Sequence, residues 1–397
     1  MSITQLRPDI RYVGVNDRTT NLFESLWTLP HAVSYNSYLV VGEKVALIDT
    51  VEEHFTSRLL SNIRHEIGDR NIDYIIVNHM EPDHSSSIAA LSRVYPDLKV
   101  VGNMQTVRML EGYYGITENT ITVKEGDTLD LGNGKVLSFY LTPMVHWPET
   151  MVTWCEDDKT IFTGDAFGSF GALDGGISDK HLKFADFENE MRRYYAAIVG
   201  KYGPQVQKAL AKVNKLAPEM ICSTHGPVWE NSVAEVIDIY DRMSRYEAEN
   251  GVVIAYGSMY GNTEQMAEEI ARGLAEEGVE KVLVYNLATT DPSVVLRDVF
   301  RYNSLIVGSP TYNAELFPPV AHLLDALVMR GIKQRHFAAF GSFTWANTAT
   351  KALKDFAEKM KWEPVVPVQE MKQGYSEEKC AAPAREIAHA IAEKLKA

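Results

Sequence analysis

Cysteine is scarce in this sequence, and the cysteines that occur are widely separated. The 397 residues contain three of them, Cys155, Cys222 and Cys380, and none belongs to a CxxC pair. This spacing argues against a disulfide framework and against a cysteine-ligated zinc or iron–sulfur site. We therefore expect the protein in a reducing cytoplasm.

Long apolar runs and an excess of positive charge are also missing. No stretch approaches the roughly 18 apolar residues that a membrane helix needs. The first residues, MSITQLRPDIRYVG, do not resemble a signal peptide. Acidic residues outnumber basic ones by 53 to 39, which gives a formal net charge of −14. These features argue against a membrane or a nucleic acid as the main partner.

What the sequence does contain is two halves with different strand and helix patterns. Up to about residue 230, short β-rich runs such as NSYLVV, KVALIDTV and IDYIIVNH dominate, which predicts a sandwich of sheets covered by helices. After Gly251, runs such as SLIVGSP alternate with amphipathic helices, as in a doubly wound parallel sheet. We expect a helix over 231–250 and place the two domains at residues 1–248 and 249–397.

Titratable side chains gather where the predicted strands of the first half end. The stretch NHMEPDHSSS follows the apolar run YIIV and offers two histidines and two acids within six positions. Together with three residues that follow other apolar runs, the candidate metal ligands are His79, Glu81, Asp83, His84, His146, Asp165 and His225. One histidine at a strand end is more often structural, but the joint occurrence of all seven residues favours a metal site.

The pattern H-x-[HE]-x-D-H, followed by separate His, Asp and His residues, resembles the metallo-β-lactamase superfamily over roughly residues 30–230. That resemblance implies an α+β fold, an αββα sandwich with a two-metal site in its loops. Most hydrolases of the superfamily carry His where this chain has Glu81. A carboxylate in place of an imidazole makes the site more anionic and shifts its preference from zinc toward iron.

Three loops in the second half offer the groups that a flavin nucleotide needs. The first precedes a helix whose N-terminus favours a phosphate, and the others contribute Tyr312 and Trp345, which could lie against an isoalloxazine ring. Either aromatic alone would more often be a surface or core residue. Together the loops resemble flavodoxin, which implies an α/β flavodoxin-like domain and FMN. The residues expected to bind it are Ser258, Met259, Tyr260, Gly261, Asn262, Thr263, Pro310, Thr311, Tyr312, Asn313, Ser342, Phe343, Thr344, Trp345 and Ala346.

A β-lactamase-like domain followed by a flavodoxin-like domain resembles the flavodiiron proteins, also called A-type flavoproteins. By this resemblance one iron is bound by His79, Glu81 and His146, the other by Asp83, His84 and His225, and both by Asp165. In some family members the position of His84 does not bind metal. Tyr195, in the pair Tyr194–Tyr195, matches a position near the irons, where it would donate a hydrogen bond to bound substrate or simply pack.

The flavodiiron family reduces dioxygen to water, nitric oxide to nitrous oxide, or both, and so scavenges these gases. Two ferrous ions supply two electrons and reduced FMN two more, which makes the four that dioxygen needs. No CxxC pair of a rubredoxin follows the second domain, so we expect a separate electron donor, such as rubredoxin or a reduced deazaflavin coenzyme. The resemblance also implies a head-to-tail homodimer, or a tetramer of such dimers.

Two alternatives remain open. One is a zinc-dependent hydrolase of metallo-β-lactamase type fused to a flavodoxin module. The other is an FMN electron shuttle attached to an inactive sandwich, although no expected ligand position is missing. The sequence also leaves open the choice between dioxygen and nitric oxide, and the choice between donors.

Overall fold

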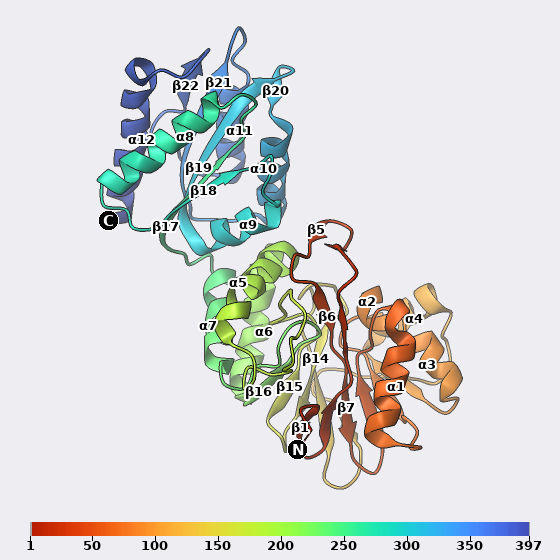
Figure 1. The fold of residues 1–397 in the computed structure, drawn as a ribbon. Coiled ribbons are helices and arrows are strands. Elements are labelled where there is room, and N and C mark those ends of the chain that lie inside the picture. The colour runs from red at the N-terminus through yellow and green to blue at the C-terminus, as the bar shows by residue number, and fades with distance from the viewer. Residues whose placement is uncertain (1, 397) are drawn as a thin grey trace. The chain divides into compact units, whose positions relative to one another are not determined.

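The computed structural model describes residues 2–396 and divides the chain into two compact units, Met1–Ser244 and Arg245–Ala397. Figure 1 shows both units with their elements labelled. Each unit has its own sheets and its own buried core. Among residues 2–396, every helix is too short or too polar to cross a bilayer.

The first unit is built on two main sheets. The larger contains, in order, β1 (Gln5–Arg7), β2 (Ile10–Tyr12), β7 (Tyr38–Val41), β8 (Val45–Ile48), β9 (Tyr74–Ile76), β10 (Lys99–Gly102) and β11 (Thr120–Thr122). The smaller contains β12 (Thr128–Asp130), β13 (Val136–Leu141), β14 (Met151–Cys155), β15 (Thr160–Phe162) and β16 (Met220–Cys222). Two short pairs are separate from these sheets, β3 (Val15–Asp17) with β6 (Val33–Tyr35) and β4 (Leu22–Phe23) with β5 (Trp27–Thr28).

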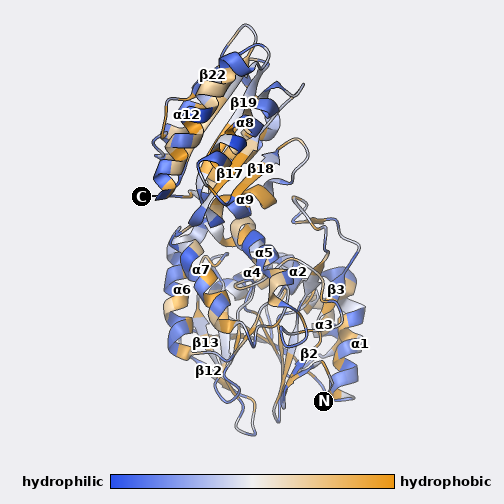
Figure 2. Cartoon of the chain, turned by 60° about the vertical axis from the view of Figure 1, so that its left-hand side comes forward, coloured by the Kyte–Doolittle hydropathy of each residue, from blue (hydrophilic) through white to orange (hydrophobic). Residues whose placement is uncertain are grey.

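Helices flank both sheets of this unit. Figures 1 and 2 show α1 (Thr56–Ile67), α3 (Ile88–Val94) and α4 (Met104–Tyr114) on the side of the larger sheet, and α6 (Gly203–Leu216) and α7 (Val233–Ser244) on the side of the smaller. The remaining helices are α2 (Pro82–Ser85) and α5 (Phe184–Tyr194), with short 3-10 turns at Glu53–Phe55 and Gly200–Tyr202 and a π-helical turn at Tyr195–Val199. This arrangement confirms the predicted helix-covered sandwich.

The central strands of the sandwich are buried along their whole length. Every residue of β8, β9, β14, β15 and β16 is buried. Their sequences are nearly continuous apolar runs, as expected where both faces of a sheet are covered. Titratable side chains follow where several of these strands end, and most of the candidate metal ligands lie there.

The second unit has a parallel sheet in the order that flavodoxin-like folds use. Its strands, in sheet order, are β18 (Val282–Asn286), β17 (Glu249–Tyr256), β19 (Tyr302–Tyr312), β21 (His336–Phe343) and β22 (Gln369–Lys372), and β20 (Glu315–Leu316) pairs antiparallel to β19. Counted along the chain, the parallel strands have the order 2-1-3-4-5. Ligands in such sheets bind beyond the carboxyl ends of the strands, next to the point where the strand order reverses.

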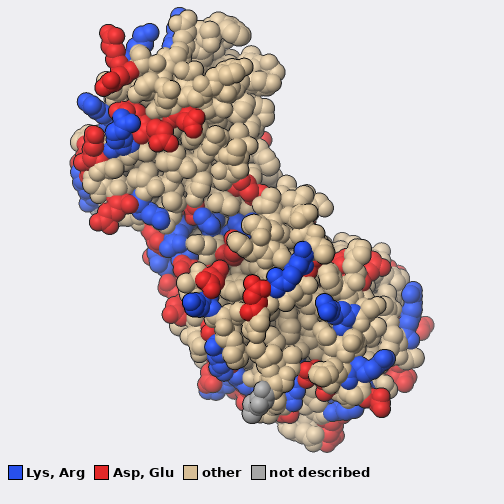
Figure 3. All heavy atoms as spheres, in the orientation of Figure 1, with Lys and Arg blue, Asp and Glu red and all other residues tan. Residues whose placement is uncertain are grey.

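Helices cover both faces of this sheet. α8 (Asn262–Glu276) and α12 (Glu377–Lys396) share a buried core with β17, and the other helices are α9 (Pro292–Arg301), α10 (Pro318–Arg330) and α11 (Ala349–Met360). Figure 2 shows the hydrophobic residues concentrated on the strands of this unit. In Figure 3 its charged side chains gather over α8 and α12, whereas on Met1–Ser244 acidic and basic side chains intermingle.

The predicted helix over 231–250 is shorter in the structure. α7 ends at Ser244, and β17 already begins at Glu249. Tyr246 has a φ of 59°, which a right-handed helix cannot accommodate. Its carbonyl accepts a hydrogen bond from Arg335 at 3.0 Å. This contact with a residue 89 positions away ends the helix early, and local periodicity could not reveal it.

Candidate metal centre and flavin pocket

Loops that follow four strands bring the seven candidate ligands together in the first unit. They follow β9, β13, β15 and β16, and the loop after β9 leads directly into α2, which begins with Pro82, a residue suited to the first position of a helix. After β16 the chain turns sharply at Gly226, where φ is 73° and a side chain would lie 2.6 Å from Ser169. A glycine at this position lets His225 face the other loops.

The first group of donor atoms consists of His79, Glu81, His146 and Asp165. His79 Nε2 lies 3.2 Å from His146 Nε2 and 3.2 Å from Glu81 Oε2. His146 Nε2 lies 3.1 Å from Glu81 Oε2 and 3.0 Å from Asp165 Oδ2. Donor atoms that share one metal at about 2.1 Å are about 3.0 to 3.4 Å apart, so these separations fit a common metal ion. A cation between them would also relieve the close approach of two imidazole nitrogens.

The second group consists of Asp83, His84 and His225, with Asp165 close by. His84 Nε2 lies 3.2 Å from Asp83 Oδ2 and 2.9 Å from Asp165 Oδ1, and His225 Nε2 lies 3.3 Å from Asp83 Oδ2. Both carboxylate oxygens of Asp83 and Nε2 of His225 are buried and make no hydrogen bond within residues 2–396. Buried polar atoms that converge without bonding one another point to a missing shared partner, and a metal ion fits that place.

Asp165 belongs to both groups. Its Oδ2 faces His146, its Oδ1 faces His84, and Thr224 Oγ1 donates a hydrogen bond to Oδ1 at 2.7 Å. The side chain is 1% exposed, so no bulk water competes for its oxygens. This geometry allows the carboxylate to bridge two metals.

The charges of the two groups depend on one another. Burial alone opposes a charged His146, but hydrogen bonds to Asp165 and Glu81 outweigh it and raise the pKa of His146 to about 9. Burial likewise opposes ionisation of Asp165, but the neighbouring imidazoles of His84 and His79 hold its pKa well below the usual value. Without a metal these histidines are therefore held as cations. Metal binding must displace those protons, since only the neutral imidazole is a ligand.

Two of the histidines are oriented by buried acceptors that sequence reasoning missed. His79 Nδ1 donates to Glu149 Oε1 at 2.8 Å, and His225 Nδ1 donates to the carbonyl oxygen of Ser34 at 2.8 Å. Burial alone would raise the pKa of Glu149, but its bonds to His79 and to the Met80 amide hold that pKa below its usual value. Both contacts leave Nε2 for a metal. Glu149 lies three positions after His146 in the stretch HWPET, and this closeness is the one sequence signal for its role. Ser34 acts through its backbone carbonyl, so its side chain gives no sequence signal.

The structure places Tyr194, rather than Tyr195, beside the second donor group. The Tyr194 ring lies 5.3 Å from the His225 ring between centroids, and its hydroxyl is buried without a hydrogen bond among the described residues. Tyr195 begins the π-helical turn, and its ring packs edge-on against Tyr240, 4.9 Å away. Tyr194 is thus a further candidate beside the donor groups, and the role of Tyr195 stays a prediction.

A cavity of about 630 Å³ opens next to the ligands. Glu81 and Asp83 form part of its lining, together with Phe23, Tyr35 and His54. The Phe23 ring also lies 5.2 Å from the His225 ring. The site therefore has access from the surface for a small molecule, alongside aromatic walls.

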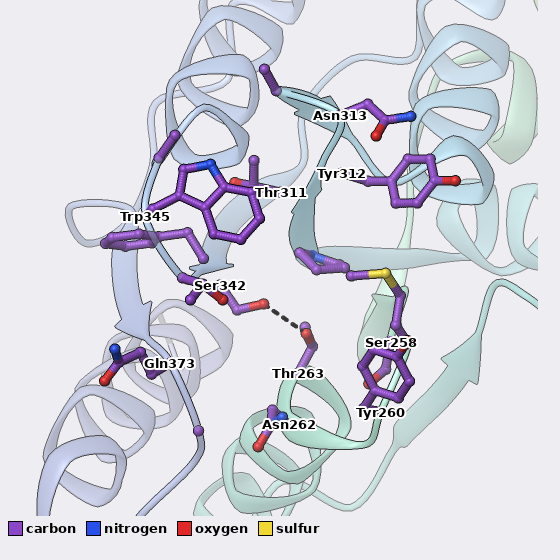
Figure 4. A pocket seen from close by; sticks show the side chains of 17 residues that line it. Ser258, Tyr260, Asn262, Thr263, Thr311, Tyr312, Asn313, Ser342, Trp345 and Gln373 are labelled. Atoms are coloured by element: carbon purple, nitrogen blue, oxygen red, sulfur yellow. Dashed lines mark hydrogen bonds between the residues drawn. The ribbon is translucent and has the colours of Figure 1, made fainter.

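The flavin loops of the second unit surround a cavity of about 560 Å³ at the carboxyl ends of the strands. Figure 4 shows Trp345 and Tyr312 on two different loops, and Thr263 bonded to Ser342 at 2.9 Å. All fifteen expected residues except Gly261 line this cavity. Gly261 lies just behind it, as the N-cap of α8 with a φ of 87°.

The same cavity contains a fourth loop that the sequence did not single out. Gln373 and Gly374, directly after β22, line it together with Ala314. This loop is tied to the first one, because Asn262 Oδ1 accepts a hydrogen bond from the Tyr375 amide at 3.0 Å. Its sequence, KQGYS, has no distinctive flavin signal.

Comparisons with known proteins agree with this two-part arrangement. Residues 33–226 match the model of the ODP family of beta lactamases, and residues 254–382 match the flavodoxin family. The anaerobic nitric oxide reductase flavorubredoxin of Escherichia coli is 33% identical over 379 residues, which cover 92% of this chain and 79% of the relative.

Solved structures show the same fold over nearly the whole chain. Rubredoxin oxygen:oxidoreductase from Desulfovibrio gigas aligns with a TM-score of 0.94 and 30% identity, covering 99% of this chain and 98% of that one. The flavodiiron protein from Giardia intestinalis aligns with a TM-score of 0.93 and 26% identity, with the same coverage. The donor set of imidazoles and carboxylates and the flavodoxin cavity fit the two cofactors that these relatives imply. The chain belongs to the flavodiiron proteins, with a non-haem diiron centre in its β-lactamase-like unit and FMN in its flavodoxin-like unit.

Proposed function

We propose that this flavodiiron protein reduces dioxygen to water, nitric oxide to nitrous oxide, or both. The observation that carries the proposal is the pair of donor groups that share Asp165, each built from imidazoles and carboxylates. Two neighbouring metals can accept or deliver two electrons together, which a single metal of fixed charge cannot do. The arrangement therefore suits a redox reaction on a small molecule.

In this proposal each ligand has a defined place. One iron is held by His79, Glu81 and His146, the other by Asp83, His84 and His225, and both by Asp165. Within these sets the protein supplies three carboxylates against the four positive charges of a diferrous pair. When bound, the iron pair supplies two electrons and reduced FMN two more, enough for one dioxygen or for two pairs of nitric oxide.

The residues around the metals control access and proton supply. Phe23 and Tyr35 give the cavity aromatic walls that a neutral diatomic gas can pass. Glu52, Glu81 and Asp83 line the same cavity, and their carboxylates disfavour anions there. Tyr194 packs its ring beside His225 and has a buried hydroxyl without a hydrogen bond among the described residues, so it could donate one to the substrate. Tyr195 remains a predicted second neighbour of the substrate.

The names of the relatives support both gases. The E. coli relative is named for nitric oxide reduction and the D. gigas structure for oxygen reduction with rubredoxin. Similarity to both proteins supports a site able to accept either gas. The hydrolase alternative is not favoured, because the matched relatives are named as oxidoreductases and Glu81 makes the first donor group anionic.

We infer that electrons come from rubredoxin, with a reduced deazaflavin coenzyme as the alternative donor. The 397 residues contain no CxxC pair that could form a rubredoxin iron site. All three cysteines are free and buried, as suits a protein kept in a reducing cytoplasm.

We also propose a head-to-tail homodimer, or a tetramer of such dimers. The candidate iron ligands and the flavin loops belong to separate units of the chain. In a head-to-tail pair related by a two-fold axis, the diiron centre of one chain could face the flavin of its partner. Mixing an Asp165→Ala chain with a chain mutated in the flavin loops should restore turnover in the mixed dimers; an inactive mixture that demonstrably contains heterodimers would exclude transfer between chains.

The direct test of the function is anaerobic purification, metal and flavin analysis, and turnover of the reduced protein with each gas in turn. We expect about two irons and one FMN per chain, and consumption of at least one gas faster than by an Asp165→Ala control. Zinc in place of iron, FAD in place of FMN, or equal rates for the two proteins would contradict the proposal.

A further inference from the structure

Glu149 is a buried carboxylate that contacts a metal-site histidine directly. Its Oε1 accepts one hydrogen bond from His79 Nδ1 at 2.8 Å and a second from the Met80 amide at 2.9 Å. Both the Glu149 and the His79 side chains are 0% exposed. One oxygen atom therefore fixes the direction of the imidazole ring and also the backbone that follows it.

The second donor group has no counterpart to this carboxylate. His225 Nδ1 donates to the neutral carbonyl oxygen of Ser34. His84 Nδ1 is buried and makes no hydrogen bond within residues 2–396. In the first group, Nδ1 of His79 thus donates to an acid. In the second group, among the described residues, Nδ1 of His225 donates to a neutral carbonyl and Nδ1 of His84 has no acceptor.

This difference has an electronic consequence. A carboxylate that accepts the Nδ1 proton makes the opposite ring nitrogen a stronger electron donor, and outer partners of this kind tune the metal that the ring binds. A negative charge held in a dry interior also stabilises the higher charge state of a nearby cation, since little solvent screens it. Both effects act on the metal at His79 more than on the metal at His225.

We propose that Glu149 is a positioning residue that makes the two irons unequal. It holds His79 in the tautomer that presents Nε2 to the metal, and it gives the iron at His79 a lower midpoint potential than it would otherwise have. This inference rests on the ligand assignment proposed above, and it adds a residue outside that set of ligands.

The test uses the isosteric variant Glu149→Gln. The Met80 amide needs an acceptor, so it keeps the oxygen of the new side chain in place of Oε1. The hydrogen bond to His79 is then retained while the charge is removed. In the iron-loaded protein we expect an upward shift of one midpoint potential of the diiron centre, and a change in the Mössbauer signal of one iron but not of the other.

Asp49→Asn is the matched control. Asp49 is also a buried carboxylate that holds the same loop, since its Oδ1 accepts from the Asn78 amide at 2.7 Å and its Oδ2 from Asn78 Nδ2 at 3.0 Å. Among the described residues its carboxylate makes no hydrogen bond to an imidazole, and its φ of 51° suits Asn. Asp49 acts on His84 and His79 only through its charge, so we expect Asp49→Asn to change the potentials and the Mössbauer signals less than Glu149→Gln does, and not selectively at the iron of His79.

The outcomes separate cleanly. A larger shift in Glu149→Gln than in Asp49→Asn, confined to one iron, or loss of one of the two irons in Glu149→Gln alone, supports the inference. Unchanged potentials and signals in Glu149→Gln, or an equal shift in Asp49→Asn, overturn it. An unmodified protein that binds no iron would instead contradict the proposed function, so the two failures can be told apart.

Discussion

Asp165 Oδ1 lies 2.9 Å from His84 Nε2, while the other oxygen of the same carboxylate faces the opposite donor group. Replacing Asp165 with Ala should therefore remove the only side chain that joins both groups. It would leave two cations close together without their shared anion. We expect loss of most of the iron and a fall in turnover of at least about 100-fold, measured by metal analysis and gas consumption.

Flavin content provides the control for the Asp165 variant. FMN binds in the other unit, so its stoichiometry should stay near one per chain. An Asp165→Ala protein that kept both irons and its full rate would show that the carboxylate does not bridge.

His84 lacks the anchor that His79 and His225 have, because its Nδ1 is buried and makes no hydrogen bond among the described residues. His79, by contrast, is held by Glu149. We expect His84→Ala to retain more iron than His79→Ala, since Asp83, His225 and Asp165 remain in place. Iron content of the two purified variants, determined side by side, checks this. Greater iron loss in His84→Ala would mean that the anchoring of Nδ1 does not govern affinity.

Tyr194 and Tyr195 can be distinguished by removing one hydroxyl at a time. The Tyr194 hydroxyl is buried next to the donor groups, and loss of one hydrogen bond worth about 1 kcal/mol lowers a rate about fivefold. We expect Tyr194→Phe to slow gas reduction by about that factor at unchanged iron content. Tyr195→Phe is the matched variant, and we expect a smaller effect because that ring packs on Tyr240. A larger loss of rate in Tyr195→Phe than in Tyr194→Phe would support the hydrogen bond from Tyr195 to the substrate that the sequence suggested.

Trp345→Ala tests the flavin cavity. The indole lines the cavity and is 90% exposed, so its removal should not unfold the unit. Loss of aromatic stacking of about 1 kcal/mol predicts a Kd for FMN about fivefold higher, with normal iron content. Met329→Ala, which removes an apolar side chain 61% exposed on α10, is the control. Equal FMN affinity in both variants, with unchanged flavin potentials, would show that Trp345 does not contribute to FMN binding.

Arg335 stabilises the start of the second unit. Its guanidinium is buried and donates to the carbonyls of Val299, Phe300 and Tyr246. Burial lowers its pKa to about 10, so it stays charged at neutral pH. Arg335→Met would leave these carbonyls without donors, at a cost on the order of 3 kcal/mol.

We expect the flavodoxin-like unit of Arg335→Met to unfold at a lower temperature, measured by flavin release during heating. Arg330→Met, at the end of α10, is the control, since Arg330 bonds a carbonyl within its own helix at 3.0 Å. Equal melting of both variants would show that the buried carbonyl contacts do not stabilise the unit.

The sequence by itself determined the fold class and most of both sites. Apolar runs such as YIIV identify buried strands, and titratable residues placed directly after them have to meet at one edge of the sandwich. For this reason all seven candidate ligands could be found before any contact was known, and so could the flavin loops. These signals are local, because each lies within a strand and the loop that follows it.

Only the tertiary structure decided how the sites are held. Glu149 reaches His79 across 70 positions of the chain, and the Ser34 carbonyl reaches His225 across 191. The tertiary structure also places the Tyr194 ring beside His225 and ends α7 at Ser244, two residues before the carbonyl that Arg335 contacts. Such contacts depend on which strands lie side by side and on backbone groups that all residues share. Spacing in the sequence therefore predicts candidate metal ligands, whereas packing determines their orientation and their charge.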